Sequence, residues 1–142
     1  QRVAGLFGRR GFNIESITVG GSEEPGLSRM TIVTSGDSRT LEQIQKQLYK
    51  LIDVIKVVDL SVFPMVSREL ALIKINAEPA MRPEILGVVD TFRASIVDVS
   101  PTTMIVQVVG DTEKIDAMVE LMKPYGILQL TRTGVTAMTR GA

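Results

Sequence analysis

The chain has 142 residues, 44% of them hydrophobic, and its 16 Lys and Arg residues balance its 16 Asp and Glu residues. This length allows one ordinary domain or two small ones, and a net charge of zero argues against binding nucleic acid through a basic surface. Histidine and cysteine are both absent, which excludes disulfides, Ser-His-Asp and Cys-His catalytic arrangements and the usual zinc ligand sets, and favours a binding or interaction protein.

A helix followed by a strand is predicted at the start of the chain. Val3, Leu6 and Phe7 have the spacing of one helix face. Gly11 fits the position after a helix, where the backbone turns left-handed. Because a helix rarely begins a protein without a preceding cap or element, a chain starting at Gln1 is expected to be a fragment.

The strand predicted over residues 12–19 changes phase part-way along. Ile14 and Ile17 lie at opposite parities of an alternating strand, which predicts a bulge or bend at Glu15–Ser16. Asn13 is polar where the strand begins. An Asn in this position either bonds nearby backbone or holds a ligand, and the pattern alone leaves both readings open.

The rest of the first half contains two more strands and a helix. Residues 28–34 read as a strand, and Thr40–Gln43 reads as a capping box that starts a helix reaching about Leu51. Residues 53–62 are rich in β-branched side chains and are predicted to be a strand. Residues 63–67 are predicted to be a short linker.

The second half repeats this plan with one more strand at its start. A helix capped by Asp111 or Thr112 carries Met118 and Met122 on its apolar stripe, so we expect both methionines in the core. Another helix, over residues 82–92, is expected to pack on the same sheet. The predicted strands cover residues 69–76, 95–99, 103–109 and 127–132.

This order of elements predicts an α+β protein of two tandem ferredoxin-like (βαββαβ) domains, covering residues 1–63 and 68–142. In this chain the N-terminal domain is expected to lack its first strand. Because small domains bury a limited core and leave sheet edges open, each domain is also expected to pair with a second copy.

Several segments resemble the regulatory (small) subunit of acetohydroxyacid synthase, also called acetolactate synthase. The most specific is GFNIES at residues 11–16. The others are RVAGLFGRRGFNIESITV, LSRMTIVT and LEQIQKQLYKLIDV in the first half, and D-x-F-R-A-x-I-V-D-V and TRTGV in the second.

The resemblance implies that the N-terminal half is an ACT domain, which pairs side by side with another copy and binds branched-chain amino acids, valine above all. It also implies a subunit without catalysis of its own. Such a subunit binds the large catalytic subunit, raises its activity and transmits feedback inhibition in valine, leucine and isoleucine biosynthesis.

The implied effector site lies at the first corner of the chain, with no catalytic and no metal-binding residues. Asn13 would offer its side-chain amide to the polar head of the amino acid, and the backbone of Ile14 would lie close by. A phase change leaves backbone groups unpaired, and these would be available to a ligand. The implied effector-binding residues are Gly11, Asn13, Ile14, Glu15 and Ser16.

The implied cofactors, thiamine diphosphate, Mg and FAD, are expected on the catalytic partner and none on this chain. The expected location is the bacterial cytoplasm, or a plastid if the source is a photosynthetic eukaryote, with neither membrane nor nucleic acid as a partner. Three alternatives are another amino-acid-sensing ACT-domain regulator, an RNA-binding module on the same fold, and a small enzyme using Lys, Glu or Tyr. An RNA-binding module would need exposed aromatic residues on its sheet.

Overall fold

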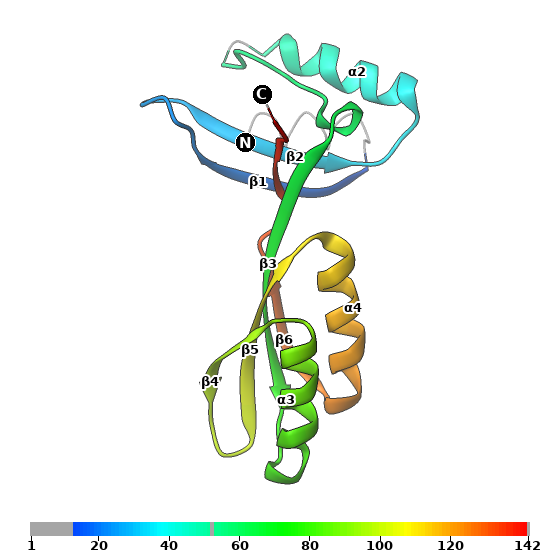
Figure 1. The fold of residues 1–142 in the computed structure, drawn as a ribbon. Coiled ribbons are helices and arrows are strands. Elements are labelled where there is room, and N and C mark those ends of the chain that lie inside the picture. The colour runs from blue at the N-terminus through cyan, green and yellow to red at the C-terminus, as the bar shows by residue number, and fades with distance from the viewer. Residues whose placement is uncertain (1–12, 52, 142) are drawn as a thin grey trace. The chain divides into compact units, whose positions relative to one another are not determined.

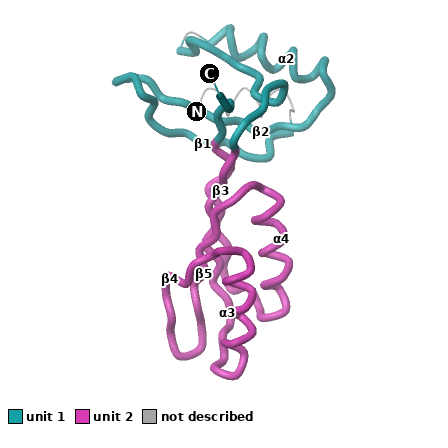
Figure 2. Tube along the Cα trace, viewed as in Figure 1, with its two compact units in different colours: residues 1–66, 137–142 teal, residues 67–136 magenta. Residues whose placement is uncertain are grey.

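A computed structural model describes residues 13–51 and 53–141 of the chain. These form two compact units (Figure 2). The first comprises residues up to Val66 together with the segment from Ala137 onward, and the second is Ser67–Thr136. The units and the predicted domains differ at the C-terminal end, where the last residues lie with the first unit.

The elements follow one another in the order shown in Figure 1. The strands are β1 (Ile14–Gly21), β2 (Ser28–Thr34), β3 (Met65–Asn76), β4 (Ser95–Val99), β5 (Thr103–Gly110), β6 (Ile127–Arg132) and β7 (Thr136–Thr139). The α-helices are α2 (Ser38–Tyr49), α3 (Arg82–Thr91) and α4 (Thr112–Met122), and short 3-10 helices cover Leu60–Val62, Pro79–Met81 and Lys123–Tyr125.

In the first unit, β1 and β2 form an antiparallel hairpin whose register shifts between Ile14 and Ser16. This shift is the bulge that the phase change predicts. Because of it, Ile14 and Ile17 both face the same side of the hairpin despite their opposite parity. That side packs on α2, where Ile44 and Leu48 are buried against Ile14.

The capping box predicted at Thr40–Gln43 is wrong. Helix α2 begins at Ser38, and the carboxylate of Asp37 caps it by accepting the Thr40 N–H at 2.8 Å. An Asp at the N-cap reaches the third helical N–H, and the N-cap therefore lies at Asp37, three residues before the predicted Thr40. The pKa of Asp37 lies below its usual value, chiefly because the Thr40 backbone N–H stabilises the carboxylate.

The strand predicted over residues 53–62 is also absent from the described part of that segment, which ends in the 3-10 turn Leu60–Val62. Side chains hold its backbone instead. The Tyr49 hydroxyl donates to the Val57 carbonyl at 2.9 Å and accepts the Val57 N–H at 3.1 Å. Asp59 accepts the Ser61 N–H at 3.0 Å. Such side-chain bonds compete with pairing between strands.

The predicted linker at 63–67 is partly wrong, because β3 already begins at Met65. The C-terminal strand β7, which the sequence analysis missed, pairs with β3. Near this pair the Arg140 N–H donates to the Pro64 carbonyl at 2.9 Å. Since the partner strand lies over sixty residues away in the chain, residues 63–67 alone do not indicate the pairing.

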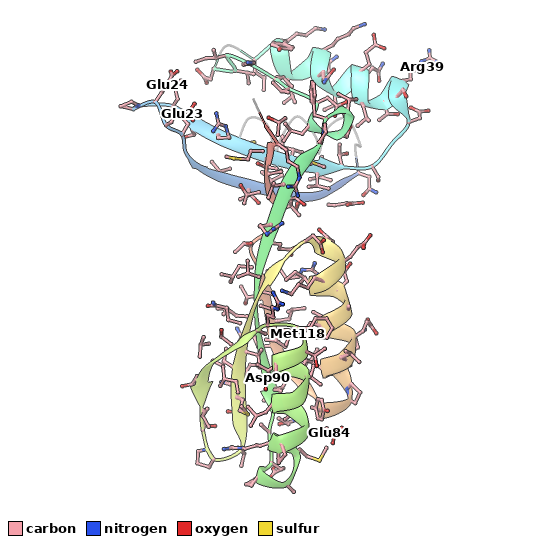
Figure 3. All side chains as sticks on the ribbon, in the orientation of Figure 1. Glu23, Glu24, Arg39, Glu84, Asp90 and Met118 are labelled. Carbon is pink, nitrogen blue, oxygen red and sulfur yellow. The ribbon has the colours of Figure 1, made fainter. Side chains whose placement is uncertain are left out.

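The second unit is the predicted strand-helix-strand-strand-helix-strand plan, with the strand order β4-β5-β3-β6. Helices α3 and α4 lie on one face of this sheet (Figure 1). Met118 (Figure 3) and Met122 are fully buried in the core, as predicted. The rest of that core consists of Ala71, Ile73, Ile75, Ala77, Ile85, Val89, Met104, Val106, Val108 and Ile115.

Arg82, the first residue of α3, ties the start of that helix to the β4–β5 turn. Its guanidinium donates to the backbone carbonyls of Ala77 at 2.9 Å, Ser100 at 2.5 Å and Pro101 at 3.0 Å. At the other end of the unit, Asp111 caps α4 by accepting the Lys114 N–H at 2.9 Å. Of the two caps that the sequence left open, Asp111 is therefore the one used.

Candidate functional site

Asn13 lies just before β1 and is exposed, and it bonds to the end of β2. Its side-chain amide nitrogen donates to the Ser35 hydroxyl at 2.8 Å. Its carbonyl accepts the Thr34 hydroxyl at 2.6 Å and the Ser35 N–H at 3.3 Å. Asn13 thus forms the local hydrogen bonds expected of a structural residue. Its side-chain oxygen has no hydrogen-bond partner among the described residues.

The bulge turns Ser16 away from the helix. Ser16 lies opposite Val33, so the two side chains share the hairpin face that points away from Ile32 and α2. The Ser16 hydroxyl oxygen is buried and has no hydrogen-bond partner among the described residues. Since buried hydroxyls are nearly always paired, this one is available to a group that the structure does not contain.

The other predicted site residues have different environments. Ile14 packs its side chain against the Ile44–Leu48 cluster, so it offers only its backbone. Glu15 occupies the bulge and is exposed. Gly11 lies outside the described residues. The structure adds Ser35, which the sequence analysis overlooked although it stands at the end of a predicted strand.

An ion pair joins the β1–β2 loop to the start of β2, and its acidic member, Glu23, lies near the hairpin tip (Figure 3). The Arg29 guanidinium lies 2.9 Å from a carboxylate oxygen of Glu23, and both side chains are exposed. The hydrogen bond from Arg29 holds the pKa of Glu23 below its usual value. An exposed pair of this kind contributes little to stability.

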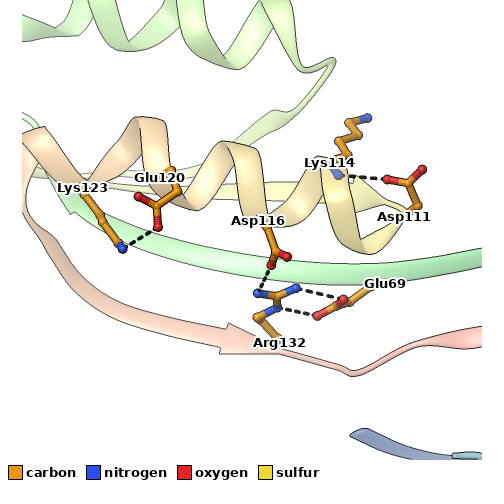
Figure 4. Close-up of polar contacts among 7 residues, drawn as sticks. All are labelled: Glu69, Asp111, Lys114, Asp116, Glu120, Lys123 and Arg132. Atoms are coloured by element: carbon orange, nitrogen blue, oxygen red, sulfur yellow. Dashed lines mark hydrogen bonds and ion pairs between the residues drawn. The ribbon is translucent and has the colours of Figure 1, made fainter. Parts of the chain in front are cut away.

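The second unit holds a more buried ionic cluster (Figure 4). Arg132 at the end of β6 donates two N–H groups to the carboxylate of Glu69, at 2.5 and 3.1 Å. A third N–H reaches Asp116 on α4 at 2.7 Å. The hydrogen bonds that Arg132 donates to the Glu69 carboxylate raise the pKa of Arg132 well above its usual value. This cluster joins two strands and a helix, so its role is to hold the unit together.

Within residues 13–51 and 53–141, no group of three or more Asp and Glu side chains is placed to hold a metal ion. No helix in the same residues is long and apolar enough to cross a membrane. The strands of the second unit carry no aromatic residue. Stacking of bases on a sheet, the usual mode of an RNA-binding module on this fold, therefore has no residues to use there.

Comparison with known proteins places both halves of the chain in one family. The profile described as "Small subunit of acetolactate synthase" matches residues 68–141, and the profile "AHAS small subunit-like ACT domain" matches residues 1–56. The chain belongs to the acetolactate synthase small-subunit family. Its fold class, α+β with ferredoxin-like ACT domains, is confirmed by the same comparison.

Similar members of the family come from archaea and bacteria. A probable acetolactate synthase small subunit of Methanothermobacter thermautotrophicus is 59% identical over all of this chain and 85% of its own length. The small subunit of Bacillus subtilis is 52% identical over 99% of this chain and 83% of its own length. The small subunit in a crystal structure from Thermotoga maritima is 45% identical in sequence. The match covers 99% of this chain and 88% of that one, with a TM-score of 0.91.

Proposed function

We propose that this small subunit binds the catalytic subunit of acetolactate synthase, raises its activity and transmits feedback inhibition by valine or another branched-chain amino acid. The effector would bind at the start of β1, where two copies of the N-terminal unit pair. The chain would have no catalytic role, and thiamine diphosphate, Mg and FAD would belong to the catalytic subunit.

The observation that carries the effector site is the buried Ser16 hydroxyl, which has no hydrogen-bond partner among the described residues and lies on the strand that follows Asn13. Ser16 offers a buried oxygen without a hydrogen-bond partner among the described residues, and the exposed Asn13 offers a side-chain carbonyl that also lacks one among them. An α-amino acid carries an ammonium donor and a carboxylate acceptor. The Asn13 carbonyl suits the ammonium, while the Ser16 hydroxyl and the second amide N–H of Asn13 suit the carboxylate.

The bulge contributes to the same site. Because two residues of β1 oppose one residue of β2 there, the regular ladder is interrupted between Ile14 and Ser16. A backbone group released from the ladder is a donor or acceptor that a small polar ligand can use. This supports a ligand with its own charged backbone groups over one recognised by its side chain alone.

The bond between Asn13 and Ser35 allows a direct test of the two readings of Asn13. In the full-length small subunit reconstituted with its catalytic subunit, Asn13→Ala removes both the ligand groups and the local bond. Ser35→Ala removes only the local bond. If Asn13 is a ligand, Asn13→Ala weakens inhibition by valine about 5- to 150-fold, the usual range of such coupling. Ser35→Ala should then leave valine inhibition within a few-fold of that of the unmodified chain.

Activation of the catalytic subunit is the control, and we expect it to survive both substitutions. Equal losses of valine inhibition in the two variants would mean that Asn13 acts only through its local bond, and the site assignment would fail. Calorimetric titrations of the reconstituted complex with valine, leucine and isoleucine identify the preferred effector. Binding of an unrelated amino acid instead would favour a different ACT-domain regulator.

A further inference from the structure

The start of β4 in the second unit repeats a feature of the start of β1 in the first. The register of β1 against β2 shifts between Ile14 and Ser16, and the register of β4 against β5 shifts between Ile96 and Asp98. In each strand one extra residue has no residue opposite it, so the side chains on either side of it point to different faces. Both strands therefore carry a bulge between an isoleucine and a polar residue.

The residues before the two bulges also correspond. Gly11 stands two residues before Asn13, and Arg93 stands two residues before Ser95. Arg93 has φ 51°, the left-handed conformation that the sequence predicts for Gly11. Each bulge thus follows a helix end, observed or predicted, and a polar residue at the same spacing. The second unit has a counterpart of every position around the proposed effector site.

Both bulges turn their polar residue to the face of the strands that the helices leave uncovered. Ser16 lies on the hairpin face that points away from α2. Asp98 lies opposite Ile105 on β5, and Ile105 lies opposite Lys74 on β3. Residues opposite each other share a face, and neighbours along a strand alternate. Since Val106 belongs to the core beneath the helices, this row lies on the other face (Figure 1).

The row carries one charge of each sign, on either side of β5. At about 4.8 Å between neighbouring strands, the backbones of Lys74 and Asp98 are about 10 Å apart. Neither side chain forms an ion pair with another described residue. The lysine ammonium stands on a flexible four-carbon stem and can move over Ile105. A small zwitterion lying on Ile105 can therefore meet both charges.

The next row along the same face supplies neutral polar groups and apolar surface. Ser95 lies opposite Gln107, and Gln107 lies opposite Leu72. The side chains of Ser95 and Gln107 form no hydrogen bond with another described residue. Their hydroxyl and amide groups can donate to a carboxylate. Leu72 is 37% exposed and Ile105 is half-buried, so together they offer an apolar surface to a side chain.

We propose that these two rows form a second amino-acid site, the second-unit site. The ammonium of an α-amino acid binds the carboxylate of Asp98, its carboxylate binds the Lys74 ammonium, and an apolar side chain lies on Ile105 and Leu72. The class of ligand rests on the proposed function, because the correspondence with the start of β1 suggests it. Asp98 replaces Ser16 in that correspondence, and an ionised carboxylate is the stronger partner for an ammonium group.

Equilibrium dialysis of radiolabelled leucine and valine against the full-length small subunit tests the site. We expect two bound amino acids per chain. Asp98→Asn and Lys74→Met should each weaken one of the two by about tenfold or more, because each removes a charge-assisted contact. Asp90→Asn is the matched control, since it removes an exposed carboxylate from α3 (Figure 3) and should leave both unchanged.

Ligand analogues separate loss of a contact from misfolding. In a chain with Asn13→Ala and Ser16→Ala, only the second-unit site should still bind. N-acetyl-leucine lacks the ammonium group, so this chain should bind it about tenfold more weakly than leucine. Adding Asp98→Asn should weaken leucine by a similar factor and N-acetyl-leucine hardly at all. A misfolded chain would lose both ligands.

The proposal fails if Asp98→Asn and Lys74→Met leave the number and affinity of bound amino acids unchanged. It also fails if the chain with Asn13→Ala and Ser16→Ala binds neither leucine nor valine. The proposed effector site can fail independently. In that case the unmodified chain binds one amino acid, Asp98→Asn weakens it, and Asn13→Ala leaves valine inhibition of the reconstituted enzyme as it was.

Discussion

The carboxylate of Glu69, a side chain only 4% exposed, is held by two N–H groups of Arg132 from the neighbouring edge of the sheet. The guanidinium is 30% exposed and reaches Asp116 with a further N–H. The pair therefore fixes β6 to β3 and to α4 at one point. Bidentate pairs of this kind are strong and directional.

Breaking this pair from one side should be costly. Arg132→Met leaves the Glu69 carboxylate buried without a partner, and we expect it to lower the free energy of unfolding of the second unit by about 3 kcal/mol. Amide hydrogen exchange in β3 measures that loss. Removing both charges with Glu69→Gln and Arg132→Met should restore part of the stability, and Asp116→Asn should cost under about 1 kcal/mol. A double variant less stable than Arg132→Met would contradict the explanation.

Arg93 should be replaceable by glycine with a gain in stability. It follows α3 with φ 51° and is exposed. Its N–H donates to the Asp90 carbonyl at 3.1 Å, and the next N–H donates to Val89 at 2.9 Å. This is a helix end in the left-handed conformation, which glycine adopts at less cost. Arg93→Gly should raise the free energy of unfolding by about 1 kcal/mol. Arg93→Ala should leave the free energy of unfolding nearly unchanged. Equal effects of the glycine and alanine substitutions would contradict the role given to the left-handed conformation.

Ser16→Ala should change stability and effector binding in opposite directions. Removing a buried hydroxyl that lacks a hydrogen-bond partner should raise the free energy of unfolding of the first unit by about 1 kcal/mol. If the hydroxyl binds the effector, the same change should weaken valine binding, measured by calorimetry on the reconstituted complex. Ser28→Ala, at an exposed position on β2, should change neither. A Ser16→Ala chain that binds valine as tightly as the unmodified chain would remove Ser16 from the site.

Tyr125 should make the stability of the second unit fall at alkaline pH. Its hydroxyl donates to Glu84 at 2.8 Å, and this hydrogen bond raises the pKa of Tyr125 above its usual value. The folded state therefore prefers the protonated phenol. The contribution is complete below the unfolded-state pKa of about 10, and it is lost as pH rises through the folded-state pKa.

Urea midpoints measured across this pH range should show the fall in the unmodified chain and a smaller one in Tyr125→Phe. The difference between the ultraviolet titrations of the two chains gives the pKa of Tyr125 directly. In Glu84→Ala that pKa should return toward its usual value. A pKa unaffected by Glu84→Ala would assign the shift to another group.

The sequence was most informative where local rules and tertiary contacts agree. The bulge between Ile14 and Ser16 followed from a change of parity, and the burial of Met118 and Met122 from helical spacing. In the second unit the predicted order of strands and helices is confirmed because each strand pairs with another inside a seventy-residue segment.

The misses have physical causes that a local pattern does not contain. Residues 53–62 have strand-forming side chains, but Tyr49 bonds both backbone groups of Val57. The pairing of β7 with β3 joins segments far apart in the chain. The register shift in β4 between Ile96 and Asp98 leaves no recognisable pattern of residue types in the sequence. At the candidate site, Asn13 stood out as a polar residue at a strand start, whereas its partner Ser35 resembled an ordinary turn residue.

The return of the chain to pair with β3 makes the second unit an insertion within the first. The segment from Ala137 onward belongs with residues up to Val66, although Ser67–Thr136 separates them. On the ribosome, the second unit can therefore finish folding while the first still awaits the segment from Ala137 onward. No single cut of the gene separates two complete units. A stop codon after residue 136 would truncate the protein in its second half and yet impair the folding of its first.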